Sequence, residues 1–198
     1  MDMHKIGKCA IVGGFILFFW AAISFTLLPW QRHQMKSFTN ERSVRSAIGD
    51  NINGSGLYIL PNLNDYGNKP SQLEGAKERM REGPFIVAAV RADGKSPTMV
   101  GNAIGSLIFK IVSAGLATWL LLRTYSPQHL DFTNTVKFMS IVGVLVGLST
   151  TVPYLIWFGF PLSFTIGSFI EIIFGWLFAG MAIARMLVEP RRKHKNKA

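Results

Sequence analysis

Four long apolar stretches occupy nearly half of this chain of 198 residues. They cover residues 9–28, 98–122, 136–154 and 163–187. An α-helix needs roughly 20 apolar residues to cross the hydrocarbon core of a bilayer, and each stretch meets this length. The sequence therefore predicts an all-α membrane protein whose four transmembrane helices form a bundle.

The first stretch has one alternative interpretation, a cleaved signal peptide. Lys5 and Lys8 precede it, as in the basic region of such a peptide. The stretch is about 20 residues long, however, and it ends at Pro29-Trp30 without the small residues of a cleavage site. We therefore expect a retained transmembrane helix.

Positive charge is concentrated outside the apolar stretches. The formal net charge is +10, ten of the 21 Lys and Arg residues lie within residues 31–97, and six lie at or after Arg185. Arg191, Arg192 and Lys193 follow the last stretch directly. Basic residues at this place are attracted by anionic lipid headgroups, so we expect contact with the bilayer and no binding of nucleic acid.

The distribution of charge also predicts the orientation in the membrane. With four spans both termini lie on the same side, and each side carries ten basic residues. Short loops and residues near the span ends decide the orientation, and the ten residues opposite the termini all lie in one segment of 67 residues. We therefore expect both termini in the cytoplasm, although Arg32 and Lys36, close to the first span, favour the reverse.

These predictions divide the chain into four parts. Residues 1–30 form a cytoplasmic N-terminus and the first transmembrane helix, and residues 31–97 form an extracytoplasmic insertion. Residues 98–190 hold the other three transmembrane helices, and residues 191–198 form a basic cytoplasmic tail. Cys9 is the single cysteine, so the insertion must fold without an internal disulfide.

The insertion has the pattern of a small α/β unit. The sequence predicts, in order, a helix over residues 40–48, a strand over 57–60, a helix with a capping box over 71–82, and a strand over 85–90. We expect the two strands to be adjacent. So small a unit buries little apolar area, and we expect it to pack on the membrane surface or on a partner.

Two pairs of glycines have the small-xxx-small spacing that lets transmembrane helices approach closely. Gly101 and Gly105 lie at the start of the second span, and Gly143 and Gly147 lie in the third. Packing within the bundle is the simpler interpretation. Dimerisation through one of these faces is the alternative.

Aromatic residues predict where the chain meets the membrane–water interfaces. All five tryptophans lie in or beside the spans, and residues 153–161 are almost wholly aromatic and apolar, with a proline at each end. We expect this segment to be a connection in the headgroup region or one that dips into the bilayer, with Trp30, Tyr154, Trp157 and Phe160 as interfacial anchors. A shelf that contacts a lipid or a substrate is the alternative role.

Two ionisable residues lie deep in the spans, Lys110 in the second and Glu171 in the fourth. Charges are costly in a bilayer, so neither side chain is expected to face lipid. A structural pair that joins the two helices is the simpler interpretation, because pairing removes most of the burial penalty. A role in proton transfer or in an ion pathway is the alternative.

Catalytic chemistry has little support in the sequence. The four histidines are scattered over tails and loops, without metal-binding spacing, and no phosphate-binding glycine loop is present. We therefore expect no metal, no cofactor and no catalytic residue. An intramembrane enzyme remains the third functional hypothesis.

Short motifs are spread over most of the chain: Phe19-Trp20-Ala21-Ala22-Ile23-Ser24, Leu28-Pro29-Trp30, Ser55-Gly56-Leu57-Tyr58, Gly83-Pro84, Pro153-Tyr154, Trp157-Phe158-Gly159-Phe160-Pro161 and Gly175-Trp176. They resemble those of a group of small four-span bacterial membrane proteins with no assigned function. The resemblance implies the topology and a bacterial source, and it brings no activity and no site residues; we expect the protein in the bacterial inner membrane.

The functional expectation is an accessory or scaffold protein that contacts lipids or other membrane proteins. A homo-oligomer is also possible. The second hypothesis is a small oligomeric transporter or channel that uses Lys110 and Glu171.

Overall fold

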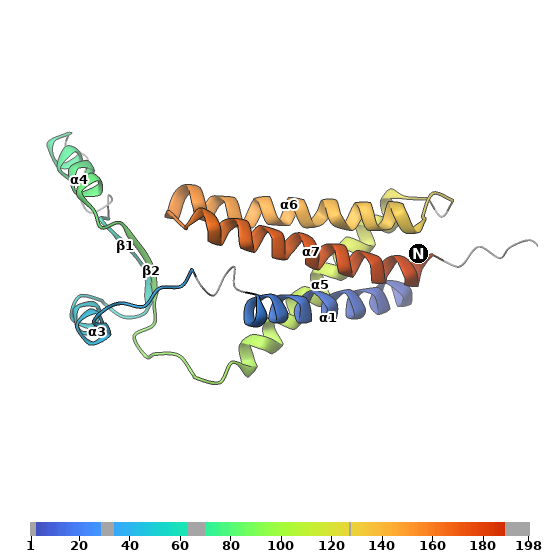
Figure 1. Ribbon diagram of the computed structural model, residues 1–198, viewed down its shortest axis with the longest axis horizontal. Helices are drawn as coiled ribbons and strands as arrows, with labels where there is room; N and C mark the ends of the chain where they lie inside the picture. Colours follow the sequence, from blue (N-terminus) through green and yellow to red (C-terminus); the bar gives the residue numbers. More distant parts are fainter. Residues whose placement is uncertain (1–2, 29–33, 63–69, 127, 189–198) are drawn as a thin grey trace, which may run out of the picture. The chain divides into compact units, whose positions relative to one another are not determined.

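The computed structural model describes residues 3–28, 34–62, 70–126 and 128–188. It divides into two units, residues 36–97 and the remainder of the chain, each of which is described by itself (Figure 1). Among the described residues, the larger unit contains four long helices, and the smaller one contains two short helices and a two-stranded sheet.

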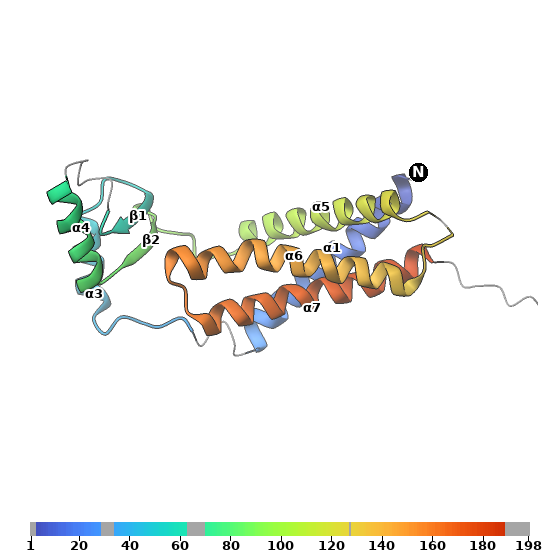
Figure 2. The same ribbon diagram turned by 90° about the horizontal axis from the view of Figure 1, so that it is seen from above.

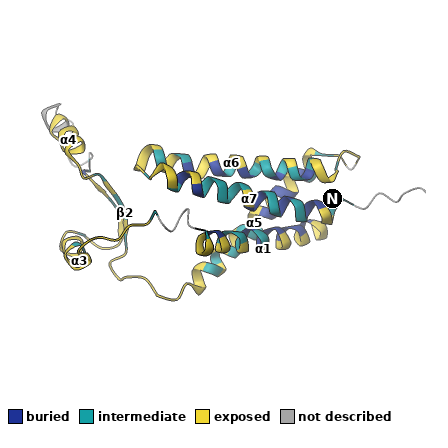
Figure 3. Ribbon diagram, viewed as in Figure 1, coloured by how far each residue is buried: buried dark blue, intermediate teal, exposed yellow. Residues whose placement is uncertain are grey.

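The four long helices are α1 (Met3–Leu27), α5 (Val100–Thr124), α6 (Phe132–Phe158) and α7 (Leu162–Leu187). Each is long and apolar enough to cross a membrane, which confirms the predicted number and indicates a multi-pass membrane protein. Exposed residues cover their outer faces (Figure 3), and these include Phe109 and Ile141, which are 75% and 67% exposed. Such faces suit contact with lipid.

The predicted connection over residues 153–161 is wrong, because most of it is helical. Helix α6 continues through Pro153 to Phe158, and only three residues separate it from α7. The glycine at the end, Gly159, adopts the left-handed conformation (φ 67°), and the N–H of Phe160 donates to the carbonyl of Tyr154 at 3.2 Å. A proline removes one N–H from the helix, but in a transmembrane helix the loss of that bond is tolerated.

Helices pack in two close pairs. Helix α1 lies against α5 and α6 lies beside α7, and contacts between α1 and α7 join the pairs, whereas α5 and α6 meet only sparsely (Figures 1 and 2). The first pair is close because Gly14 in α1 has no side chain. A Cβ atom there would lie 2.6 Å from the Cα of Ile111 in α5.

The second close pair also depends on glycines. A Cβ on Gly143 or Gly147 of α6 would lie 2.7 Å and 2.6 Å from the side chains of Trp176 and Phe169 in α7. In the opposite direction, a Cβ on Gly180 of α7 would lie 2.7 Å from the Cβ of Met139. Small residues therefore bring these two backbones together, as is usual where lipid gives little hydrophobic driving force.

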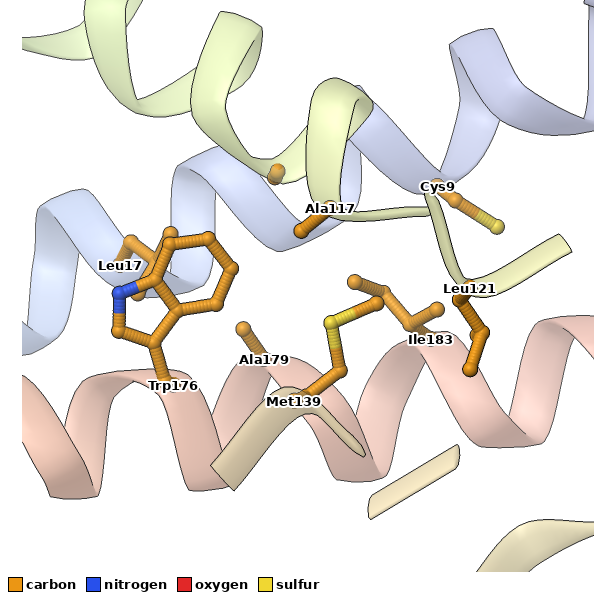
Figure 4. Close-up of a cluster of buried hydrophobic side chains, with 9 residues drawn as sticks. Cys9, Leu17, Ala117, Leu121, Met139, Trp176, Ala179 and Ile183 are labelled. Atoms are coloured by element: carbon orange, nitrogen blue, oxygen red, sulfur yellow. The ribbon is translucent and has the colours of Figure 1, made fainter. Parts of the chain in front are cut away.

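A compact set of buried side chains lies where the four helices meet (Figure 4). It consists of Cys9, Leu17, Ala114, Ala117, Leu121, Met139, Trp176, Ala179 and Ile183. The hydroxyls of buried threonines beside it donate hydrogen bonds to carbonyls of their own helix. Thr118 Oγ1, for example, donates to the carbonyl of Ala114 at 2.8 Å. Each such bond satisfies a hydroxyl that has no access to water.

The insertion has the predicted order of elements. It contains α3 (Glu41–Asp50), β1 (Gly56–Leu60), α4 (Pro70–Glu82) and β2 (Ile86–Val90). The strands pair antiparallel from Gly56 with Val90 to Leu60 with Ile86, which confirms that they are adjacent. Helix α4 begins one residue before the predicted start and ends at Glu82 as predicted.

Local hydrogen bonds stabilise the two helices of this unit. The side chain of Asn40 accepts from the N–H of Ser43 at 3.0 Å and caps α3. In α4, the hydrogen bond from Lys77 to Glu74 at 2.7 Å holds the pKa of the Glu74 carboxyl below its usual value. These groups are exposed to solvent, so the pair adds little to stability.

The insertion buries few apolar side chains. Ala76 is fully buried, but Leu57 and Ile59 on one face of the sheet are 73% and 42% exposed. A two-stranded sheet with open faces is marginally stable in isolation. Packing of this unit on the membrane surface or on a partner therefore stays a prediction.

Replacement of Gly14 tests the close contact of α1 with α5. We expect Gly14→Ala to lower the thermal midpoint in detergent and to cost about 1–3 kcal/mol, because the new methyl group collides with backbone atoms that cannot rotate away. Gly7→Ala, in the same helix but with no atom within 4 Å of the new Cβ, is the matched control and should be neutral or slightly stabilising. Equal effects of the two changes would contradict the described contact.

Candidate functional site

A cleft of about 360 Å³ lies within the four-helix unit and is lined mainly by residues of α5, α6 and α7. Its lining is mostly apolar and contains three polar side chains, those of Lys110, Ser113 and Glu171. The full lining is Leu17, Lys110, Ser113, Leu116, Ala117, Leu120, Val142, Val146, Glu171, Ile172, Gly175 and Trp176. A hollow of this size with a few convergent polar groups is typical of a binding site.

The cleft exists because α5 and α6 diverge. Each is held to another helix, α5 to α1 and α6 to α7, through the glycine contacts. The two walls meet near the α5–α6 connection, where the rings of Tyr125 and Phe138 form an edge-to-face contact at 6.3 Å. Leu116 and Leu120, on the wall formed by α5, are 59% and 47% exposed, so nothing in the described chain covers the cleft there.

Lys110 and Glu171 both line this cleft, although they come from different helices. Lys110 lies ten residues after the first residue of α5, and Glu171 lies nine residues after the first residue of α7. At 1.5 Å per residue both are therefore about 15 Å along their helices, near the middle of a hydrocarbon core about 30 Å thick. The structure thus brings together the two charges that the sequence singled out.

The two charged side chains interact through their charges. The carboxylate of Glu171 acts electrostatically on the Lys110 ammonium. Within the described part of the chain, Lys110 makes no hydrogen bond and no ion pair closer than 4 Å. Its three N–H groups are therefore left to whatever enters the cleft.

Trp20 positions the helix that carries Glu171. Its indole Nε1 donates to the backbone carbonyl of Glu171 at 2.8 Å. Gly175 makes room for the indole, because a Cβ there would lie 3.1 Å from Trp20 Cδ1. Trp176, 6% exposed, belongs to the buried cluster (Figure 4) and also lines the cleft.

Trp20 and Trp176, which are not among the predicted interfacial anchors, pack between helices. Of the residues that we expect at an interface, Tyr154 and Trp157 are 48% and 74% exposed in the last turns of α6. The Tyr154 ring lies 5.2 Å from that of Phe160. Their function as anchors stays a prediction.

The predicted glycine pairs have different surroundings. Gly143 and Gly147 contact α7, whereas Gly101 and Gly105 have no described atom within 4 Å of a Cβ position. A packing role of Gly101 and Gly105 would thus require contact with atoms outside the described residues, such as those of another chain in the dimer alternative. Gly14, Gly175 and Gly180 also make close contacts and were not predicted, although Ala10 and Gly14 have the same small-xxx-small spacing.

Several expected residues carry no further structural information. Trp30, Arg191, Arg192 and Lys193 lie outside the described residues. Among the residues that the structure does describe, no group of three His, Cys, Asp or Glu side chains could hold a metal ion.

Comparison of the chain with family models, with curated proteins and with solved structures finds no match. The function must therefore be inferred from the site itself.

A double-mutant cycle tests the coupling of the two charges. Lys110→Met and Glu171→Gln each leave the other charge without an opposite charge in the cleft, and each should lower stability in detergent by about 1–2 kcal/mol. This is less than the about 3–5 kcal/mol typical of breaking a directly bonded buried pair. The double replacement should cost less than the sum of the single ones.

The control for this cycle is Lys137→Met, at an exposed position in the first turns of α6. It should leave stability within about 0.5 kcal/mol of the wild type, as is usual for surface changes. Strictly additive effects of the Lys110 and Glu171 changes would show that the two charges act independently.

Proposed function

We propose that the protein is an accessory or scaffold subunit of a membrane, and that it holds a transmembrane segment of another membrane protein in the cleft between α5 and α6. The observation that supports this proposal is an uncovered, mostly apolar cleft that presents Lys110 and Glu171 at the depth of the hydrocarbon core. The proposed location is the bacterial inner membrane, because the resemblance of the sequence implies a bacterial source.

The energetics of the bilayer favour an occupied cleft. Lys110 would otherwise meet lipid tails through the open side, where charged groups are costly. A groove between two helices is also the shape that receives a third helix. The stripe from Lys110 to Leu120 on α5 spans ten residues, or about 15 Å, and offers nearly three helical turns of contact.

A transporter or channel is the second candidate, because two opposite charges line one cavity in the spans. A transporter or channel would need a water-filled path through the membrane. In a chain of this size, that path would have to be a pore between copies. The cleft instead has largely apolar walls. These walls suit a helix better than an ion, and so the accessory function is the first proposal.

Photo-crosslinking in native membranes tests the accessory function. A crosslinking amino acid at Val146, on the cleft wall of α6, should give one discrete adduct with another protein. The same probe at Leu148, which is 50% exposed outside the cleft, should give no discrete protein adduct. A discrete adduct of the chain with itself from Val146 would favour the oligomeric alternative.

Variants that fill the cleft give the matched control for this experiment. Val142→Trp should abolish both the adduct and copurification of the partner after mild detergent extraction, because the indole occupies the groove. Leu148→Trp places the same side chain on the outer face and should leave both intact. Retention of the partner by Val142→Trp would contradict docking in the cleft.

Labelling tests the proposed orientation, with both termini in the cytoplasm. In a Cys9→Ser background, a membrane-impermeant maleimide should label Asp93→Cys in intact cells, because Asp93 lies in an exposed turn of the insertion. Gln128→Cys, in the connection between α5 and α6, should react only after permeabilisation. The opposite pattern would reverse the orientation and leave the four helices unchanged.

A further inference from the structure

We infer that the transmembrane helix held in the cleft carries a carboxylate, an Asp or a Glu, near the middle of the bilayer and places it against Lys110. This inference rests on the proposed function and specifies the chemistry of the partner. It follows from the charge, the depth and the shape of the cleft.

The charge of the cleft favours an acidic occupant. Lys110 presents three N–H donors on the wall of α5, and no described residue of the chain accepts from them. Glu171 acts on Lys110 electrostatically and does not accept a hydrogen bond from it. A carboxylate from the occupant would make the direct, charge-assisted hydrogen bonds that the chain itself does not provide.

The depth of the cleft favours a protein helix over a lipid headgroup. Lys110 is about 15 Å along α5, so a phospholipid phosphate would have to leave the headgroup region and move to the middle of the hydrocarbon core. An acidic residue in a transmembrane helix lies at that depth by its position in the sequence.

A second copy of this chain does not fit the cleft. Glu171 is the one acidic residue in the four long helices, and in each copy it already lines its own cleft. Two concave clefts face to face would enclose a cavity rather than close-pack. The exposed faces of the same helices, such as that of Ile108 and Val112 on α5, carry no carboxylate.

Synthetic transmembrane peptides test the inference with a defined probe. Three leucine-rich helices that differ only at the central residue, Glu, Gln or Leu, would be mixed at pH 8 with the full-length protein in phosphatidylcholine vesicles. Binding would be measured by energy transfer from a donor on Gln128→Cys in the Cys9→Ser background. We expect the Glu peptide to bind about tenfold more tightly than the Gln peptide.

Variants of the protein sharpen this expectation. Lys110→Met should remove the preference for the Glu peptide, whereas Lys137→Met, which removes an exposed charge outside the cleft, should keep it. Glu171→Gln should increase the preference, because it removes a carboxylate that repels that of the peptide. A structural role of Glu171 alone would not produce this gain.

The outcomes separate this inference from the proposed function. If all three peptides bind equally and Val142→Trp blocks this binding, the inferred carboxylate on the partner helix would be wrong, but docking of a helix in the cleft would stand. Absence of binding by every peptide would overturn both. A preference for phosphatidylglycerol over phosphatidylcholine that depends on Lys110, without a peptide preference, would assign the cleft to an anionic lipid, and transfer between copies of the protein would assign it to an oligomer.

Discussion

Close backbone contact at glycines is the constraint on which the packing of the four helices depends. Lipid tails are as apolar as leucine, so helices in a bilayer associate through tight packing and through hydrogen bonds rather than through the hydrophobic effect. Gly14 allows α1 to reach the backbone of α5, and Gly143 and Gly147 allow α6 to reach α7. Gly175 then admits the indole of Trp20, whose bond to the carbonyl of Glu171 ties the two pairs together.

The cleft is a consequence of this pairing. Ala114 and Gly115 of α5 face α1, and Gly143 and Gly147 of α6 face α7, so these small residues do not bring α5 and α6 together. The two helices touch near Tyr125 and Phe138 and then separate. The polar side chains of Lys110 and Glu171 lie in the space between them, so the same contacts that hold the bundle together also expose its charged interior.

Much of this architecture could be predicted from the sequence. Length and hydropathy are enough for the four helices, and the glycine breaks and β-rich segments are enough for the order of the insertion. The course of α6 beyond Pro153 could not be predicted, because a proline ends a helix in water but is tolerated in lipid. Spacing alone also did not distinguish Gly101, which faces open space, from Gly143, which faces Trp176, since that difference depends on how the helices are rotated.

Part of the candidate site could likewise be predicted from the sequence, and part could not. A charge in a span can be recognised from the sequence, and equal depth follows once the helix starts are known. Whether Lys110 and Glu171 bond directly depends on the separation of α5 from α7. No pattern in a single sequence predicts that separation. Had the two helices closed on each other, the charges could have formed a self-sufficient structural pair. Because the walls stay apart, Lys110 makes no direct bond within the described chain, and the proposed binding of another group in the cleft rests on this observation.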